Sequence, residues 1–251
     1  MRYRTDKTGF GEVLLKQDTE GFCYGLDAVI LADFVSKFLL GGEKVIDLGT
    51  GNGIIPLILA HKNNDINIVG VELQESAAEL AEENVERNNL KERITIINKD
   101  IRNLSDEFWE RFDVVCCNPP YFKKGAGMIS KNDAKMVARH ETTADISDFL
   151  KSSEKLLVAE GELLMVHRPE RLVDIFESAR KIGLEPRQMR MIKPYIDKPA
   201  NLVLVKMKKG RGRGLKIISD MIVREKSGKY SEEILEIYEK SDKKILSFTK
   251  N

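Results

Sequence analysis

The stretch that decides the fold is KVIDLGTGNG, residues 44–53. Its apolar side chains Val45, Ile46 and Leu48 form a short run that is typical of a strand buried in a parallel sheet. Asp47 lies near the end of that run, and a glycine-rich turn and a helical stretch opening with Ile-Ile-Pro follow at once. A strand, a glycine turn and a helix N-terminus together let a nucleotide-like ligand lie against the backbone.

The spacing of the glycines and of one acidic residue narrows the class of ligand. A dinucleotide fingerprint needs its third glycine at the sixth position, which here is Ile54, so the pattern is G-x-G-x-G. Nineteen residues after Gly53, the apolar run 66–71 ends in Glu72, whose carboxylate is well placed to accept hydrogen bonds from two ribose hydroxyls. An ordinary glycine-rich turn needs no such acid, so a ligand site is favoured. The pair resembles motifs I and II of the S-adenosylmethionine-dependent methyltransferases.

Composition bounds the class of protein. The chain has 251 residues, is 42% hydrophobic and can bury a substantial core, while Lys+Arg at 41 against Asp+Glu at 40 leaves a net charge of +1. The overall charge therefore argues neither for nor against a polyanionic partner such as RNA. Only local clusters of charge can bear on that question. Cys116 and Cys117 are adjacent in an apolar run and Cys23 stands apart, which indicates a reducing cytosol without a disulfide framework. Three scattered histidines give no metal-ligand spacing, and there is no apparent membrane span or signal peptide, so we expect a cytoplasmic protein without a metal.

A second anchor is FDVVCCNPPY, residues 112–121. Its apolar start predicts the fourth strand, and Pro119 pushes Asn118 out of helical geometry, so the chain leaves the sheet in a stiff turn. In a doubly wound sheet the fourth strand lies beside the first, and ligands gather beyond the carboxyl ends at that switch point. We therefore expect the glycine-rich loop and the Asn-Pro-Pro-Tyr turn to face the same crevice.

Asp100 follows the predicted strand 94–97 closely. In S-adenosylmethionine-dependent methyltransferases an acid at this place commonly holds the adenine amino group of the ligand. An aspartate after a strand is often only a turn or cap residue, but Asp47 and Glu72 set a context that favours the ligand role.

The remaining segments complete an α/β fold. We expect residues 1–22 to form a small hairpin or an extended cover. Asp27 is expected to be the N-cap of a helix, and Ser76 and Glu79 are expected to form the capping box of another. Alternating strand and helix patterns predict an α/β fold with a seven-stranded, mostly parallel sheet and helices on both faces. The resemblance of the glycine-rich loop and Glu72 to motifs I and II implies that this fold is the Rossmann-like fold of class I methyltransferases. We expect one domain with small terminal extensions, divided into an N-terminal cover at 1–43, a catalytic core at 44–208 and a C-terminal extension at 209–251.

Two charged segments are candidates for substrate contact. The stretch 122–146 lacks periodicity, and so long a connection inside a compact domain is usually functional or mobile. Within it, His140 is favoured as a loop residue in contact with substrate or solvent over a catalytic base, because no partner acid or nucleophile is evident. The stretch 206–216, KMKKGRGRGLK, contains no acid, and a solvated hairpin tip and a contact to RNA phosphates are equally favoured there.

With both anchors identified, nearly the whole chain resembles class I methyltransferases of the N6-adenine type. The resemblance is carried by VIDLGTGNG, VELQ and NPPYF, together with YGLDAVILADF, ARHE and the C-terminal VREKSGKYSEE. Within that group the chain resembles the bacterial family that methylates adenine 37 of valine tRNA at N6. The resemblance implies S-adenosyl-L-methionine as the cofactor and tRNA as the partner, and leaves the oligomeric state open.

The resemblance also implies roles for individual residues. The side-chain oxygen of Asn118 and the carbonyl of Pro119 would accept the two N–H bonds of the amine, and Tyr121 would stack on the unstacked base. The catalytic turn comprises Asn118, Pro119, Pro120 and Tyr121. The cofactor site comprises Tyr24, Asp27, Asp47, Gly49, Thr50, Gly51, Asn52, Gly53, Glu72, Leu73, Asp100, Ile101 and Asn118. Substrate contacts are expected from Phe122, Lys123, Lys124, Arg139, His140, Lys209, Arg211 and Arg213. Transfer is an in-line displacement governed by proximity and orientation, without a metal or a dedicated general base.

Three alternatives stay open. Methyltransferases that act on a glutamine of peptide release factors use the same NPPY turn, but they usually carry a helical domain before motif I, and 43 residues precede Lys44 here. A nicotinamide oxidoreductase is disfavoured by Ile54 at the third glycine position. A non-catalytic RNA-binding protein on this fold is disfavoured by the intact Asn118 and Tyr121.

Overall fold

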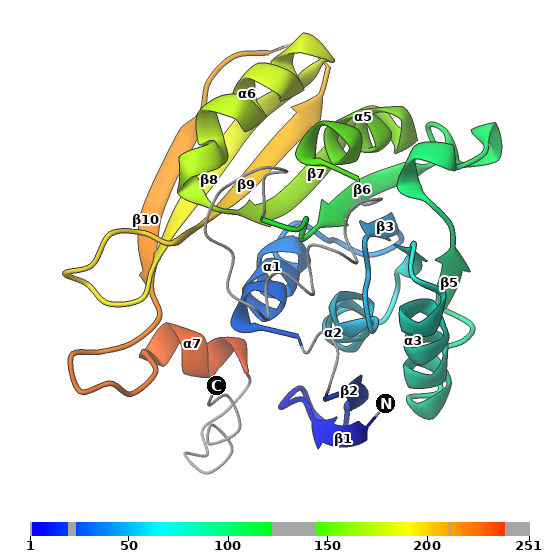
Figure 1. Cartoon of the computed structure of the whole chain (residues 1–251). Coiled ribbons are helices and arrows are strands. Elements are labelled where there is room, and N and C mark those ends of the chain that lie inside the picture. Colours follow the sequence, from blue (N-terminus) through cyan, green and yellow to red (C-terminus); the bar gives the residue numbers. More distant parts are fainter. Residues whose placement is uncertain (1, 20–23, 122–143, 211, 239–251) are drawn as a thin grey trace.

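An eight-stranded sheet forms the centre of the molecule (Figure 1). The computed structural model describes residues 2–19, 24–121, 144–210 and 212–238. The strands run in the order β10-β8-β9-β7-β6-β3-β4-β5, and within this sheet β9 is antiparallel to both of its neighbours while the other pairs are parallel. The strands are β3 (Lys44–Leu48), β4 (Asn67–Glu72), β5 (Ile94–Asn98), β6 (Phe112–Cys117), β7 (Leu157–His167), β8 (Leu184–Lys193), β9 (Leu202–Lys209) and β10 (Lys216–Ile222).

The predicted α/β fold with a mostly parallel sheet is confirmed, and the sheet has one strand more than the seven expected. The additional strand is β10, which pairs in parallel with β8 and places Ile222 opposite Lys193. Without it the edge of β8 would present unpaired backbone groups. Met221 of β10 is buried in the core, so this strand is an integral part of the sheet.

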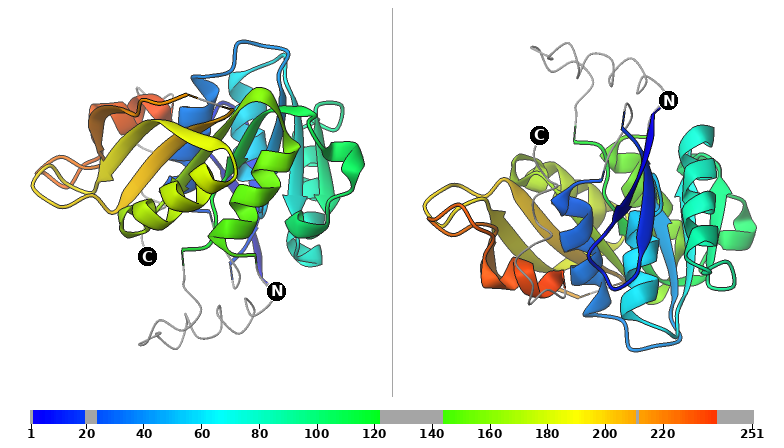
Figure 2. Two further views of the ribbon diagram at one scale, coloured as in Figure 1. Left: turned by 90° about the horizontal axis from the view of Figure 1, so that it is seen from above. Right: turned by 90° about the horizontal axis from the view of Figure 1, so that it is seen from below.

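Helices cover both faces of the sheet (Figures 1 and 2). Because side chains of a strand point alternately to its two faces, Val45 and Cys116 pack in the core beneath α1 and α2. Their neighbours Ile46 and Cys117 pack in the second core, beneath α5 and α6. The helices are α1 (Leu26–Ser36), α2 (Ile54–Lys62), α3 (Glu75–Arg87), α5 (Ile146–Leu156), α6 (Leu172–Lys181) and α7 (Glu232–Ile237), with 3-10 turns η1 (Ile101–Asn103), η2 (Asp106–Phe108) and η3 (Pro169–Arg171).

The N-terminal segment forms the predicted hairpin, β1 (Tyr3–Lys7) and β2 (Leu14–Asp18), paired in antiparallel fashion. Two asparagine side chains hold it in place, one from α3 and one from the residue that caps its C-terminus. Asn88 Oδ1 accepts from the Leu14 amide at 2.9 Å, and Asn84 Oδ1 accepts from the Lys16 amide at 2.7 Å. The Asn84 amide nitrogen also donates to the Asn52 carbonyl at 3.0 Å, so the hairpin is coupled to the glycine-rich loop.

Two predicted helix caps are wrong. Helix α1 begins at Leu26 with Gly25 as its N-cap, and Asp27 lies in the first turn, where its Oδ1 accepts from the Ala28 amide at 2.9 Å. Helix α3 begins at Glu75, before Ser76, because the Glu72 carboxylate holds the Gln74 amide at 2.9 Å and makes Gln74 the N-cap. Across the described ranges, none of the helices has both the length and the apolar character to span a bilayer.

Candidate active site

The glycine-rich loop after β3 is held by backbone hydrogen bonds. The amides of Gly49 and Thr50 both donate to the Val71 carbonyl, at 2.8 and 3.0 Å. Gly49, Gly51 and Gly53 adopt φ values of 74°, 58° and 83°, in the left-handed region that side chains other than glycine rarely occupy. The backbone of the loop can therefore turn tightly at the N-terminus of α2.

Glu72, at the end of β4, fixes the same loop from the other side. Its Oε2 accepts from the Gly51 amide and its Oε1 from the Gln74 amide, both at 2.9 Å. A carboxylate has about four lone-pair positions, so each oxygen keeps one for a further donor. Glu72 is 7% exposed, and it can accept from two ribose hydroxyls while it holds the loop.

Asp47 is fully buried at the end of β3. Burial raises the pKa of its carboxyl to about 7, and the Cys116 thiol donates to Oδ1 at 3.5 Å. The Thr50 side chain also interacts with this carboxyl and lowers its pKa, although less than burial raises it. Within the part of the chain that the structure describes, Asn52 Nδ2 is buried without a hydrogen-bond partner. Because buried polar atoms are normally paired, this amide nitrogen and the buried Asp47 carboxyl fit a ligand with polar and cationic groups, as S-adenosylmethionine has.

Asp100 is the N-cap of η1, which is one of the two roles expected for it. Its carboxylate accepts from the Arg102 amide at 2.9 Å and forms an ion pair with the Arg102 guanidinium. The hydrogen bond from Arg102 lowers the pKa of the Asp100 carboxyl. An adenine amino group would have to share this carboxylate with Arg102, and the ligand role of Asp100 stays a prediction. Leu73, which is 39% exposed, and Ile101, which is buried, flank the same edge.

The Asn-Pro-Pro-Tyr turn leaves the sheet beside the glycine-rich loop. In the register of β3 and β6, Leu48 lies opposite Cys117, so the residues that follow each strand emerge together. The Tyr121 hydroxyl lies 2.7 Å from Asn118 Oδ1 and 2.7 Å from Asp27 Oδ2. The expected proximity of the two motifs is thus present, and Asp27 contacts the catalytic turn directly.

Two residues at the end of β7 hold the Tyr121 ring. The His167 ring makes an edge contact with it, with centroids 5.3 Å apart, and the Arg168 guanidinium lies 4.9 Å from the ring centre. Burial lowers the pKa of His167 to about 4, so its imidazole is neutral at physiological pH. The guanidinium of Arg168 therefore contributes the positive charge beside the ring.

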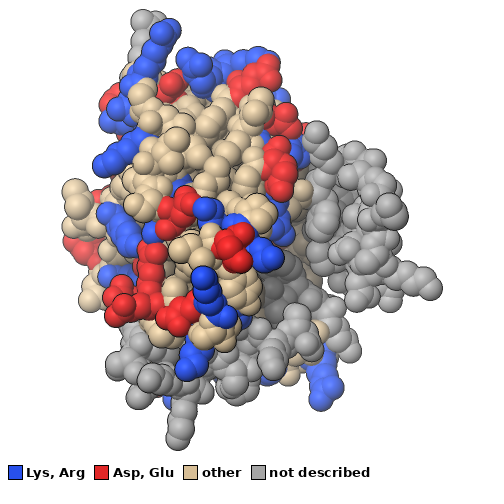
Figure 3. Space-filling view, turned by 90° about the vertical axis from the view of Figure 1, so that its left-hand side faces the viewer, with Lys and Arg blue, Asp and Glu red and all other residues tan. Residues whose placement is uncertain are grey.

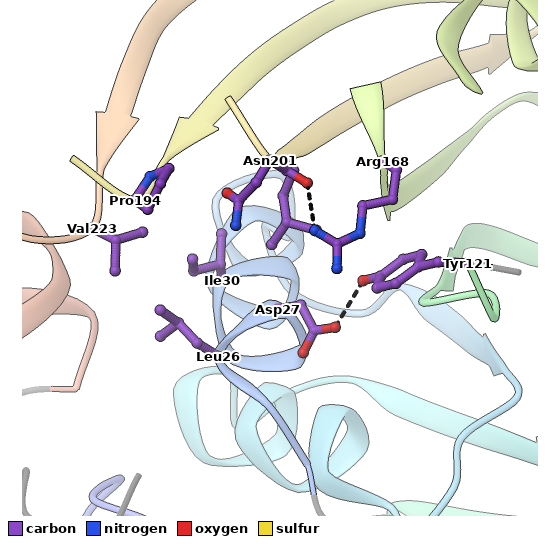
Figure 4. A pocket seen from close by; sticks show the side chains of 9 residues that line it. Leu26, Asp27, Ile30, Tyr121, Arg168, Pro194, Asn201 and Val223 are labelled. Carbon is purple, nitrogen blue, oxygen red and sulfur yellow. Dashed lines mark hydrogen bonds between the residues drawn. The ribbon is translucent and has the colours of Figure 1, made fainter. Parts of the chain in front are cut away.

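A cavity of about 250 Å³ opens next to Tyr121 (Figure 4). Arg168, Pro194 and Val223 each directly follow a strand, and Asn201 directly precedes β9. Because β9 runs antiparallel to its neighbours, all four residues meet at the edge of the sheet that bears Asn118. Sequence reasoning missed them, although the rule that ligands gather beyond strand ends is the signal that points to them. The complete lining is Leu26, Asp27, Ile30, Tyr121, Arg168, Pro194, Asn201, Leu202 and Val223.

The described residues of the basic stretch 206–216 do not reach this site. The antiparallel direction of β9 carries its last residue, Lys209, to the opposite edge of the sheet, and this end of β9 lies at the top of Figure 1. Lys209 Nζ donates to the carbonyls of Glu154 and Leu157 at 2.8 and 3.0 Å, so a role in substrate contact is not supported for it. Lys206 and Lys208 pair with Glu162 and Glu160. Arg213 is exposed at that far edge. Phe122, Lys123, Lys124, Arg139, His140 and Arg211 lie outside the described residues.

Comparisons with known sequences agree with this geometry. The family model of the methyltransferase small domain matches residues 28–176. The tRNA1(Val) (adenine(37)-N6)-methyltransferase of Trichodesmium erythraeum is 30% identical over 80% of this chain and 83% of its own length. The enzyme of the same name from Tolumonas auensis is 28% identical over 90% of this chain and 92% of its own length.

Solved structures share the fold. A predicted O-methyltransferase from Agrobacterium tumefaciens superposes with a TM-score of 0.67 at 20% identity, covering 85% of this chain and 95% of its own. M. jannaschii TYW2 in complex with AdoMet gives a TM-score of 0.55 at 18% identity, over 82% of this chain and 86% of its own. The chain belongs to the methyltransferase small domain family, and it is an S-adenosylmethionine-dependent methyltransferase.

Proposed function

We propose that the enzyme methylates the N6 amine of an adenine in tRNA, and that its target is adenine 37 of valine tRNA. The observation that carries the proposal is the emergence of Asn118 beside the glycine-rich loop, through the pairing of Leu48 with Cys117. A methyl donor lying over that loop is next to an amide able to bind an amine. The target position follows the curated relatives that are named for this reaction.

The residues of the turn would make the amine a better nucleophile. The lone pair of an exocyclic adenine nitrogen is delocalised into the ring, which makes the free amine a poor nucleophile. Acceptance of its two N–H bonds by Asn118 Oδ1 and the Pro119 carbonyl draws the nitrogen toward a tetrahedral geometry. S-adenosylmethionine supplies, when bound, the methyl group on a cationic sulfur. The protein then has to hold the two reacting atoms in line, and this lowers the activation barrier through proximity and orientation.

The residues proposed to hold the cofactor surround the loop after β3. Glu72 accepts from the ribose, and Asp47 provides a negative charge for a cationic group. The pKa of Asp47, raised to about 7 by burial, would fall again beside a positive charge. The remaining loop residues are Gly49, Thr50, Gly51, Asn52 and Gly53.

The cavity beside Tyr121 supports an unstacked nucleotide as the substrate. Its walls include the apolar side chains of Ile30, Leu202 and Val223, which suit the faces of a base. Asp27 and Arg168 add an acceptor and a cationic donor to its lining. Enzymes that modify a base in RNA must extrude it from its stack, and a cavity with apolar walls and few polar groups serves this purpose.

The surface around the cavity offers scattered cations for the RNA backbone. Lys198 follows β8, and Lys226 and Lys229 follow β10, all exposed on loops at the edge that bears the cavity. Figure 3 shows that basic and acidic side chains are interspersed over the lower part of this side of the molecule. Binding would therefore rest on a few phosphate contacts rather than on one broad basic patch.

A labelling experiment tests the class of substrate. The enzyme is incubated with radiolabelled S-adenosylmethionine and, in parallel, with bulk tRNA or with a protein extract. Label should enter the RNA, and digestion to nucleosides should recover it as N6-methyladenosine, while the Asn118→Ala variant should transfer little. Label on a glutamine of the protein fraction would instead favour the glutamine methyltransferase alternative, and label in another nucleoside would contradict the proposed chemistry.

A further inference from the structure

The hydroxyl of Tyr121 lies between two oxygen atoms of other residues. Asp27 Oδ2, from the first turn of α1, is 2.7 Å away, and so is Asn118 Oδ1, from the catalytic turn. Both distances are those of full hydrogen bonds. A phenol has a single hydrogen and a carboxylate can only accept, so the hydroxyl cannot donate to both neighbours at once.

The side-chain amide of Asn118 can resolve this conflict by rotation. Its oxygen and nitrogen exchange places on a half-turn, and the hydrogen-bond network decides which of them faces a neighbour. With the nitrogen toward Tyr121, the amide donates to the hydroxyl oxygen and the hydroxyl donates to Asp27. Every group in this series of hydrogen bonds then has a partner, and Asn118 Oδ1 faces away from Tyr121.

The direction of the hydrogen bonds that link Asn118, Tyr121 and Asp27 decides whether Asn118 presents its side-chain oxygen or nitrogen to a substrate. In the direction just described, an acceptor is available for an N–H bond of the incoming amine. In the opposite direction the hydroxyl donates to Asn118 Oδ1, Asp27 must carry a proton, and the amide presents N–H donors to the donors of the amine. Only the first direction makes Asn118 a partner of an amine.

We propose that Asp27 is a positioning residue which, through the Tyr121 hydroxyl, turns the side-chain oxygen of Asn118 toward the substrate amine. This proposal rests on the proposed function, in which that oxygen accepts from the N6 amine. It gives Asp27 a role in orienting the catalytic turn instead of the expected role in binding the cofactor.

The surroundings hold the three side chains in this arrangement. The second oxygen of Asp27 accepts from the Ala28 amide at 2.9 Å, which fixes the carboxylate in the first turn of α1. His167 and Arg168 contact the Tyr121 ring and restrict its movement. Burial and the neighbouring Asp27 carboxylate raise the pKa of the Tyr121 hydroxyl, so it keeps the hydrogen that the chain needs. Figure 4 shows the side chains of Tyr121 and Asp27 pointing toward one another, with a dashed line for the hydrogen bond between them.

A double-mutant cycle on the full enzyme tests the proposal. Tyr121→Phe keeps the ring but removes the hydroxyl, Asp27→Ala removes the terminal acceptor, and the double variant removes both. Single-turnover methylation of tRNA at saturating cofactor should fall roughly 10- to 100-fold in each single variant, which is the worth of one hydrogen bond to a charged group. The double variant should be no slower than either single variant, because all three break the same chain. Cofactor affinity, measured by calorimetry, should not change.

Two further variants control for folding and for nonspecific effects. Asp27→Asn keeps the size of the side chain and an oxygen able to accept from Tyr121, so it should recover most of the rate that Asp27→Ala loses. Tyr3→Phe, on the exposed strand β1, makes the same chemical change far from the turn and should methylate at the parental rate.

Several results would overturn the proposal. A Tyr121→Phe variant with parental rate would show that the hydroxyl orients nothing. A further loss of rate when Asp27→Ala is added to Tyr121→Phe, or a weaker cofactor affinity in Asp27→Ala, would assign Asp27 an independent role at the cofactor. Failure of Asp27→Asn to recover the rate would also contradict the proposed series of hydrogen bonds from Asp27 through Tyr121 to Asn118. If the parent enzyme methylates no adenine in tRNA, the proposed function itself fails, and this inference fails with it.

Discussion

The two halves of the catalytic edge are built in different ways. The half formed by β3 and β4 holds its loop with backbone hydrogen bonds at 2.8 to 3.0 Å and with one carboxylate, Glu72. The half formed by β6 to β10 is assembled from side chains of distant segments, among them Asp27, Tyr121 and Arg168. The first half is fixed by local conformation, whereas the second depends on the order in which the strands join the sheet.

This difference indicates a division of labour. A loop fixed by its own backbone presents one geometry, which suits a cofactor that never changes. A cavity made of side chains from several segments can be altered one residue at a time, which suits recognition of a particular substrate. Substitutions in the first half should therefore change cofactor affinity, and substitutions in the second half should change turnover or RNA recognition.

The largest effect is expected from Asn118→Ala. Loss of one of the two acceptors of the amine should lower the single-turnover rate by about 10²-fold or more, the cost of removing one oriented hydrogen-bonding group. Cofactor affinity should be unchanged, because the glycine-rich loop keeps all its contacts. Single-turnover methylation assays measure the rate, and calorimetry on the same preparation measures the cofactor affinity. A near-parental rate would contradict the role of Asn118 in the mechanism.

Glu72→Ala should produce the reverse pattern. The substitution removes two ribose acceptors and releases the amides of Gly51 and Gln74. Hydrogen bonds to a charged group contribute about 1.5 to 3 kcal/mol each, so the loss of two should lower cofactor affinity by about 10²-fold at the lower end of that range. At saturating cofactor most of the turnover should return. Unchanged affinity would contradict the assignment of Glu72, and so would a turnover defect that saturation does not relieve.

Asp47 predicts a pH dependence of cofactor binding. Burial raises its folded-state pKa from 3.8 to about 7, so near pH 6 the buried carboxyl carries a proton that the unfolded chain has lost. The stability contribution of this group is present at low pH and is lost as pH rises through 7. A cationic ligand favours the carboxylate, so binding should release this proton, and affinity should rise by up to about tenfold per pH unit below pH 7 and then level off.

Calorimetry between pH 5.5 and 8 measures this dependence, and the isosteric Asp47→Asn variant is its control. The variant cannot ionise, so its affinity should be lower at neutral pH and should lack this rise. If Asp47→Asn shows the same rise as the parent, the titrating group lies elsewhere.

The smallest effects concern the RNA surface. Lys226 lies on the loop after β10 at the edge that bears the cavity, and Arg213 lies at the opposite edge. If Lys226 meets a phosphate, Lys226→Ala should flatten the plot of log affinity for tRNA against log salt by roughly one unit. Arg213→Ala removes one exposed charge at the far edge and should leave the slope as it is. The opposite outcome would move the RNA to the basic stretch 206–216.

The proximity of the glycine-rich loop and Glu72 can be predicted from the sequence because each motif there is local. The strand, the glycine turn and the helix of 44–62 are contiguous, and Glu72 stands at the end of the next strand, so spacing alone brings them together. The NPPY turn is equally local. The α/β fold follows from the alternation of strands and helices, which is also a property of neighbouring residues.

The substrate half is less predictable because it depends on sheet topology. The antiparallel direction of β9 brings Asn201 to the catalytic edge and takes Lys209 away from it, and the addition of β10 brings Val223 to the cavity. The acids that neutralise Lys206 and Lys208 come from β7 and are invisible in a local stretch of sequence. Asp27 likewise fits the pattern of a helix cap, whereas its partner Tyr121 lies 94 residues further along the chain.

The most direct test of the account is methylation of a single defined RNA. A valine tRNA transcript and the same transcript with guanine in place of adenine 37 are incubated with the enzyme and S-adenosylmethionine, and the products are mapped by mass spectrometry of nuclease fragments. The account predicts one methyl group, on N6 of adenine 37, in the first transcript and none in the second. Equal methylation of both transcripts, or a methyl group at any other atom, would contradict it.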